Sequence, residues 1–187
     1  MDVPWGSEGT SKFVTNVGII TTDGPWGPNA MAAEWTHLVS YAPGRIAVNV
    51  GPGKATAENI LASKEFGVNL VAEDQNVFAS IAGATSGKQV DKIAVMKEVG
   101  AKFFPAGKIK APMLEGAALN AECKLFGYYD IGDHTFFVGD VVALKVNASK
   151  PIVYHRNKYW KVGEPVEKPS EQEQARHAEL AKKHAKK

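Results

Sequence analysis

The spacing of apolar positions predicts a chain built mainly from strands. A β-branched run over 13–22 ends at the turn sequence Asp23-Gly24-Pro25, and a second apolar alternation covers Arg45–Val50 before Gly51-Pro52-Gly53. Period-two alternation returns over 66–70. These patterns predict three strands in the first half of the chain.

The residue pattern in the second half of the chain predicts paired strands. Residues 119–125 and 135–146 flank the turn sequence Asp130-Ile131-Gly132-Asp133 and predict a long antiparallel hairpin. Residues 151–154 and 159–162 predict a shorter hairpin. Because strands that can pair lie close together in sequence, a closed antiparallel barrel with helical insertions is favoured over a parallel sheet.

Helical spacing interrupts the strands in three places. It covers Thr56–Ser63, where Thr56 is expected to cap the first turn, and it recurs over 77–81 and 93–99. The segment Asn29–Ser40 mixes good helix formers with residues that suit a sheet, so the pattern leaves its structure open.

Length and composition predict one domain followed by a tail. The chain has 187 residues, of which 44% are hydrophobic and 22% charged, and this is enough to bury one ordinary core. The domain is expected over 1–166. Residues 167–187 contain Leu180 as their one large apolar residue, which predicts a charged helical or disordered tail.

Charge and cysteine content argue against several classes of protein. A formal net charge of +2 does not favour a nucleic-acid partner. The single cysteine, Cys123, cannot form an internal disulfide, and no cysteine or histidine spacing is typical of a metal site, so none is predicted. The sequence shows neither a signal-peptide pattern nor an apolar stretch long enough to span a membrane, so we expect a soluble, cytoplasmic protein.

The stretch from Gly51 to Asn59, GPGKATAEN, is a candidate phosphate site. A glycine turn, a lysine and a threonine near a helix start supply several donors and one cation, as a phosphate requires. Neither GxxxxGK[ST] nor GxGxxG occurs, which argues against nucleoside-triphosphate chemistry. The same residues also fit an ordinary capped helix after a turn. Likewise, His134 can donate a proton near neutral pH or can simply satisfy the turn beside it.

Four segments in fixed order resemble a known family. They are TT…GPNAMAAEWTHLVSYAPGRIAVNVGPGKATAENI, KEFGVNL, DIGDHTFFVGDVV and KPIVYHRNKYWKVGEPV, within residues 13–166. Together they resemble the flavin reductase-like family of FMN-binding split barrels, which includes flavoredoxin and archaeal ferric reductases. The resemblance implies a mainly β fold, a six-stranded antiparallel Greek-key split barrel with short helical additions. It also implies a homodimer with the flavin at the subunit interface.

The resemblance further implies a set of site residues. Those beside the flavin ring are Asn29, Ala30, Met31, Ala32, Glu34, Trp35 and Thr36; those near the ribityl chain are Asn49, Val50 and Gly51; those facing the phosphate are Lys54, Thr56 and Asn59; and Ser86 and Lys92 approach from a helical region. His134, in the family's GDH turn, is implied as the catalytic residue near the flavin and the nicotinamide.

Glu34 departs from the family pattern, in which serine or proline often occupies this run. A carboxylate that points toward the flavin would disfavour the anionic reduced form and lower its potential, whereas one that points outward is a surface charge. The sequence leaves this direction open.

The implied activity is that of an NAD(P)H-dependent flavin or ferric reductase, with hydride passing to flavin N5 and electrons then passing to an acceptor. FMN is favoured over FAD, and the choice between NADH and NADPH stays open. The acceptor could be a ferric chelate, free flavin, a rubredoxin-like protein or a partner oxygenase. Two alternatives remain: a flavin-binding electron carrier without nicotinamide turnover of its own, and a non-flavin β-barrel module whose lysine-rich tail contacts nucleic acid or an acidic partner.

Overall fold

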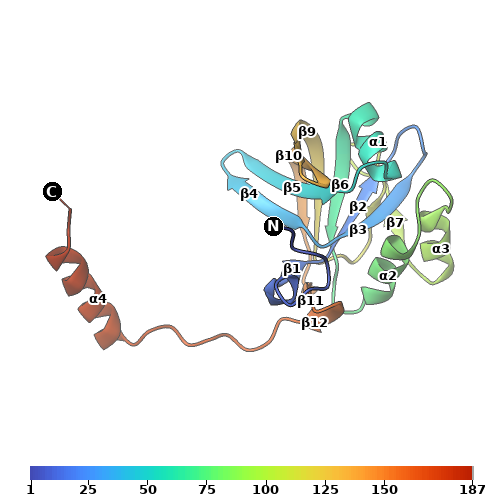
Figure 1. The fold of residues 1–187 in the computed structure, drawn as a ribbon. Coiled ribbons are helices and arrows are strands. Elements are labelled where there is room, and N and C mark those ends of the chain that lie inside the picture. The colour runs from blue at the N-terminus through green and yellow to red at the C-terminus, as the bar shows by residue number, and fades with distance from the viewer. Residues whose placement is uncertain (187) are drawn as a thin grey trace.

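A seven-stranded antiparallel sheet forms the centre of the fold (Figure 1), in the computed structural model, which describes residues 1–186. Its spatial order is β3-β2-β6-β9-β10-β5-β4. The strands are β2 (Gly18–Thr22), β3 (Asn29–Ala33), β4 (Thr36–Tyr41), β5 (Gly44–Val50), β6 (Glu65–Leu70), β9 (Leu119–Ile131) and β10 (His134–Val146). The predicted long hairpin is therefore confirmed as β9 and β10.

The sheet closes because its two edge strands are successive parts of one segment. β3 and β4 lie at opposite ends of the strand order, yet only Glu34 and Trp35 separate them along the chain. A bend at these two residues lets the segment 29–41 pair with β2 on one side and with β5 on the other. The expected six strands thus become seven, because the bend divides one strand in two.

This pairing also decides the structure of Asn29–Ser40. Its alanines, methionine and leucine favour a helix when taken alone, but β3 aligns residue by residue with β2, from Thr22↔Asn29 to Gly18↔Ala33. The hydrogen bonds that this segment forms with β2 outweigh its preference for a helix, which amounts to roughly a few tenths of a kcal/mol per residue. The segment is therefore extended.

Three helices cover the sheet as predicted, namely α1 (Ala55–Ser63), α2 (Asn76–Ala84) and α3 (Lys92–Glu98). The expected cap at Thr56 is wrong. The chain turns at Gly53, with φ +72°, and enters α1 at Ala55, so that Lys54 occupies the capping position without a side-chain hydrogen bond. Thr56 lies inside the first turn, where its hydroxyl accepts a hydrogen bond from the Asn29 amide at 2.9 Å.

The smaller elements lie beside the barrel. They are η1 (Thr10–Lys12), β1 (Thr15–Asn16), β7 (Phe103–Phe104), β8 (Met113–Leu114), β11 (Ile152–His155) and β12 (Lys158–Lys161). β11 pairs with both β1 and β12 and confirms the predicted short hairpin. Arg156 and Asn157 form its turn at φ +50° and +60°.

The barrel interior is closely packed. Phe66 and Phe137 are fully buried there with aliphatic side chains of the facing strands. A Cβ on Gly139 would come within 2.7 Å of both Cys123 Cβ and the Phe66 ring, so this position tolerates only glycine without a shift of its neighbours. Cys123 is buried in this core, and burial raises the pKa of its thiol to about 12. The thiol is therefore not a nucleophile near neutral pH.

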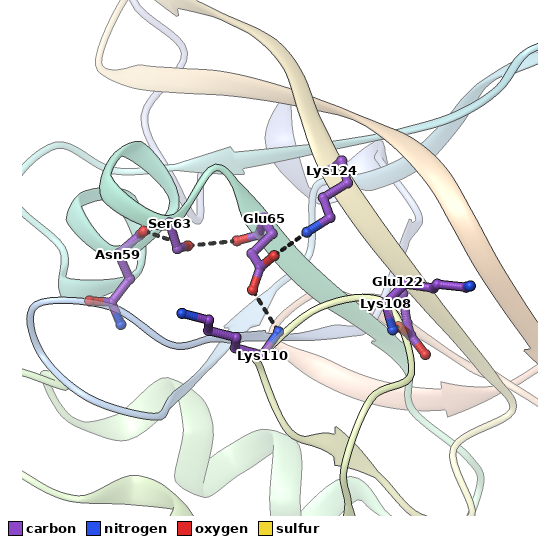
Figure 2. Close-up of polar contacts among 7 residues, drawn as sticks. All are labelled: Asn59, Ser63, Glu65, Lys108, Lys110, Glu122 and Lys124. Carbon is purple, nitrogen blue, oxygen red and sulfur yellow. Dashed lines mark hydrogen bonds and ion pairs between the residues drawn. The ribbon is translucent and has the colours of Figure 1, made fainter.

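Two carboxylates fasten the loop between β7 and β8 to the outside of the sheet (Figure 2). Glu65 accepts hydrogen bonds from the Lys110 backbone N–H, at 2.6 Å, and from the Lys124 ammonium. Glu122 accepts from the backbone N–H groups of Gly107 and Lys108 at 3.0 and 2.5 Å. Side-chain carboxylates of β6 and β9 thus hold the backbone of this loop on the sheet.

The chain ends in an isolated helix, α4 (Glu171–Lys183), which stands away from the barrel (Figure 1) and buries none of its residues. A capping box between Ser170 and Glu173 starts it. Within residues 1–186, the structure shows no helix with the length and apolar character needed to cross a bilayer.

Candidate functional site

A cavity of about 1440 Å³ lies beside the bend between β3 and β4. Its walls come from this bend, the start of α1, the loop between α2 and α3, the N-terminal segment and the β11–β12 turn. The sequence-predicted residues that line it are Asn29, Met31, Ala32, Glu34, Trp35, Asn49, Gly51, Lys54, Thr56, Ser86, Lys92 and His134. The fold therefore brings together residues that are more than 100 positions apart in the sequence.

Four of the implied residues lie outside the cavity. Ala30 and Val50 are fully buried in the hydrophobic packing of β3 and β5. The Thr36 hydroxyl donates to the Ala33 carbonyl, and Thr36 lines a different recess. The Asn59 amide is occupied by Thr22 Oγ1, at 3.0 Å, and by backbone groups of the β2–β3 loop.

Two lysines make one end of the cavity cationic. Lys92 is only 3% exposed, and its ammonium donates to the carbonyl oxygens of Ala82, at 2.9 Å, and Thr85, at 3.3 Å. Burial, with a smaller contribution from the charge of Lys54, lowers the pKa of Lys92 to about 8. No carboxylate within residues 1–186 forms an ion pair with Lys92. A buried cation with only neutral partners favours a bound anion.

The loop between α2 and α3 is pressed against the same end. A Cβ on Gly87 would lie 2.1 Å from Asn29 Oδ1, so only glycine permits this approach. Outside the cavity, Lys88 pairs with Glu58 at 2.5 Å and lies over the Trp26 ring, while the Trp26 indole N–H donates to Glu58 at 2.6 Å. These contacts tie the loop to α1 and to the β2–β3 loop.

Buried acceptors in the cavity wall lack partners. The side-chain oxygens Asn29 Oδ1, Asn49 Oδ1 and Thr15 Oγ1 are shielded from solvent and accept no hydrogen bond from any group of residues 1–186. Unpaired buried carboxamide oxygens are costly, at about 1–3 kcal/mol each.

His134 stands at the first position of β10, facing the bend between β3 and β4. Its Nδ1 lies 2.8 Å from Asp133 Oδ1, and its ring centroid lies 4.8 Å from that of Trp35. The hydrogen bond and charge of His134 lower the pKa of Asp133. The other ring nitrogen, Nε2, lies 3.9 Å from the position that a Cβ would take if Gly51 were replaced by a larger residue. A carboxylate on Nδ1 fixes the ring orientation and leaves Nε2 for another partner.

Glu34 points into the cavity rather than away from the protein. Its carboxyl group is partly buried, and burial raises its pKa, while the charge of His134 acts in the opposite direction. Tyr154 also lines the cavity, and burial, with a smaller contribution from the charge of Glu34, raises its pKa. The direction that the sequence left open is therefore inward.

The family of the chain follows from comparison with known proteins. The flavin reductase like domain matches residues 10–163. The chain belongs to this family. An uncharacterized protein of Pyrococcus abyssi is 32% identical over 115 residues, which are 62% of this chain and 64% of that protein. The chain thus spans less than two thirds of this relative's length. The NADH-dependent FAD reductase of Streptomyces globisporus is 28% identical over 131 residues, 70% of this chain and 69% of that protein.

Solved structures of the flavin reductase like family share the fold. The flavin reductase component of a bacterial two-component tryptophan halogenase superposes with a TM-score of 0.72 at 28% identity, covering 83% of this chain and 94% of that chain. The mainly β architecture expected from the sequence is therefore confirmed.

Reasoning from the sequence missed several residues of the cavity in this family member, among them Trp5, Phe13, Gly87, Arg156 and Tyr159. The Ser86-Gly87 pair between two predicted helices was an available signal for a tight loop. Arg156 and Tyr159 belong to the shorter hairpin, whose pattern predicts a turn but not which cavity the turn faces.

Proposed function

We propose that this protein is an FMN-binding NAD(P)H oxidoreductase. The observation that carries the proposal is the cavity wall, in which Lys54 and the buried Lys92 lie at one end and His134 and Trp35 lie together beside the bend between β3 and β4. A monophosphate fits the lysines, and a flavin ring fits beside the bend. FMN carries both groups in one molecule.

The chain's own residues divide this task. Lys54, Lys92 and Ser86 would hold the phosphate, with Thr56 fixed behind them by the Asn29 amide. Asn49 and Gly51 would lie beside the ribityl chain. A bound flavin would supply the redox chemistry, namely the capacity to take up a hydride and release electrons. The protein supplies position, exclusion of water and charge.

His134 is proposed as the catalytic residue. Asp133 holds Nδ1, and the Trp35 ring limits the motion of the imidazole. Nε2 is then able to donate a hydrogen bond or a proton to the reacting end of the nicotinamide or the flavin. Asp133 acts through His134 and is a positioning residue.

We further propose that two copies form a homodimer. Large apolar side chains are exposed on two neighbouring parts of the barrel, with Leu38, Val39 and Tyr41 on β4 and Leu144 and Val146 on β10; Tyr41 is 92% exposed. Exposed apolar surface of this kind is typical of interfaces. Light scattering is expected to give twice the chain mass of 20.1 kDa, and a mass of one chain at micromolar concentration would contradict the dimer.

The electrons are proposed to leave for an acceptor outside this chain, such as a ferric chelate, free flavin or a partner oxygenase. A similar structure is the reductase component of a two-component halogenase by its name, which favours delivery of reduced flavin to a partner enzyme. Steady-state turnover with each acceptor class, at fixed NADH, tests this choice.

An absorbance spectrum tests the proposed function. Purified protein should be yellow or become so on reconstitution with FMN, and the flavin band should bleach on anaerobic addition of NADH or NADPH. A protein that stays colourless and binds no added FMN would overturn the proposal. Bleaching by dithionite but by neither nucleotide would favour a flavin electron carrier instead.

The charge of Glu34 is expected to lower the midpoint potential of the bound flavin. Its carboxylate faces the cavity and disfavours the anionic reduced form, so Glu34→Gln should raise the two-electron midpoint potential by roughly 30 mV, equivalent to about 1.4 kcal/mol. Because burial raises the pKa of Glu34, the difference between the two proteins should disappear on acidification, at a higher pH than for an exposed glutamate. Spectroelectrochemical titration measures it. Glu98→Gln, on the exposed surface of α3, is the control, and equal potentials for E34Q and wild type would contradict the prediction.

A further inference from the structure

One surface carboxylate joins three segments around the lysine end of the cavity, which is the end that Lys54 and Lys92 make cationic. Glu58 lies in the first turn of α1. Its Oε1 accepts a hydrogen bond from Lys88 Nζ at 2.5 Å, and its Oε2 accepts one from the Trp26 indole N–H at 2.6 Å. Lys88 belongs to the α2–α3 loop and Trp26 to the β2–β3 loop. We call Glu58, Lys88 and Trp26 the latch.

The latch lies outside the cavity and forms a closed network. Its three residues do not line the cavity, so they cannot touch a ligand inside it. Lys88 Nζ also lies 4.8 Å from the centroid of the Trp26 ring, whose face attracts a cation. Each member of the latch therefore contacts the other two. Such a network holds its members more firmly than an isolated ion pair on a protein surface, which contributes little.

The α2–α3 loop depends on the latch more than the β2–β3 loop does. The Trp26 backbone N–H donates to Asn59 Oδ1 at 3.0 Å, and the Asn59 amide donates to the Gly27 carbonyl at 2.9 Å, so the β2–β3 loop is bonded to α1 independently. Within residues 1–186, the other hydrogen bonds of residues 85–91 stay inside this loop or reach the neighbouring α3. Lys88 is therefore the polar link between the α2–α3 loop and the opposite wall.

The α2–α3 loop carries groups that the proposed phosphate site needs. Ser86 lines the cavity, and the Thr85 carbonyl accepts one of the two hydrogen bonds that hold the Lys92 ammonium. Gly87 lies so close to Asn29 that a Cβ on the glycine would be 2.1 Å from Asn29 Oδ1. Outward movement of the loop would carry Ser86 away from the phosphate and break this contact. The position of the loop thus decides whether the lysine end is closed.

We propose that Glu58 is a positioning residue, which holds the α2–α3 loop closed over the phosphate of FMN and thereby slows release of the flavin. The inference rests on the proposed function, because it concerns the phosphate end of the FMN site. Glu58 acts through Lys88 and Trp26 and touches no part of the flavin. Riboflavin has no phosphate for the loop to enclose, so its release is independent of the latch.

Release rates test the latch. Glu58→Gln removes the charge and keeps the length of the side chain, and FMN should leave this variant about fivefold faster. Rapid dilution, followed by recovery of free-flavin fluorescence, measures the rate. Lys88→Gln should give the same increase, and the double variant should be no faster than either single variant, because both break the same link. Lys88→Arg keeps the charge and the contact with the Trp26 ring and should stay within about twofold of wild type.

Glu73→Gln is the matched control. Glu73 precedes α2, forms an ion pair with Lys161 at 3.2 Å and does not line the cavity, so its replacement should leave FMN release unchanged. If Glu58 served only to stabilise the fold around the cavity, E58Q would speed the release of FMN and riboflavin alike. Either this result or an unchanged rate of FMN release in E58Q would overturn the proposal.

Amide hydrogen exchange of the flavin-free protein separates this proposal from the proposed function. The backbone N–H groups of Gln89 and Val90 both donate to the Ser86 carbonyl at 3.0 Å, so their exchange reports how often the loop opens. E58Q should raise the exchange rate about fivefold. A protein that binds no FMN contradicts the proposed function, and exchange then decides alone: faster exchange in E58Q supports the latch, and unchanged exchange overturns it.

Discussion

Replacing Lys92 by methionine is expected to weaken FMN binding about 30-fold. The buried ammonium has only two neutral carbonyl partners, so a phosphate is the charge it lacks, and a charge-assisted contact contributes about 2 kcal/mol. Fluorescence titration measures the affinity. Riboflavin, which has no phosphate, should bind wild type and Lys92→Met equally well, and Lys97→Met, on the exposed surface of α3, should leave FMN binding unchanged.

The same lysine gives FMN binding a pH dependence. Because the pKa of Lys92 is lowered to about 8, the free protein loses this charge as pH rises above 8, and FMN affinity should fall over that range while riboflavin affinity does not. The stability of the flavin-free protein should change with pH in the opposite direction. Between about 8 and 10.4, the unfolded chain binds more protons at Lys92 than the folded protein, so the free energy of unfolding rises with pH.

Two outcomes would contradict the role of Lys92. Equal losses of FMN and riboflavin affinity in K92M would show that the substitution deforms the cavity. Unfolding of the flavin-free variant at markedly lower temperature would show that the ammonium mainly stabilises the end of α2. We expect neither, because removing the cost of a buried charge offsets the loss of the two hydrogen bonds that the ammonium donates.

Replacing His134 by asparagine is expected to slow flavin reduction by NADH about 100-fold, at the lower end of what a positioned acid or hydrogen-bond donor contributes. Its ring is held by Asp133, lies against Trp35 and lines the same cavity as the two lysines. Anaerobic stopped-flow absorbance measures the rate of this step. FMN affinity should change less than threefold, because the phosphate contacts lie elsewhere.

Two further variants extend this experiment: Asp133→Asn tests the positioning of the imidazole, and His37→Asn is the control. Asp133 acts by orienting the imidazole, so Asp133→Asn should give an intermediate loss of rate, about tenfold. His37 is exposed on β4, outside this cavity, and its replacement should leave the rate unchanged. An unaltered reduction rate in His134→Asn, with FMN bound, would remove His134 from the mechanism.

The sequence by itself predicted most of the local elements. The β-branched alternation in β5 and the two hairpins, together with the helical spacing of α1, α2 and α3, are local signals that follow from side-chain periodicity. It failed at Thr56, because the position at which a chain enters a helix depends on the turn at Gly53 and on the partner that Asn29 offers from β3. It left Asn29–Ser40 open for the same reason, since pairing with β2 and β5 decides it.

For the candidate site, too, the sequence indicated some features and the tertiary structure decided the others. The resemblance to the flavin reductase-like family implied Lys54, Lys92 and His134 as members of one site, but only the tertiary structure brings them to one cavity. The inward direction of Glu34, the isolation of Lys92 from carboxylates and the contribution of the β11–β12 turn arise from contacts between distant segments. A sequence determines which groups are available; burial, charge pairing and the facing of side chains depend on the neighbours that the tertiary structure supplies.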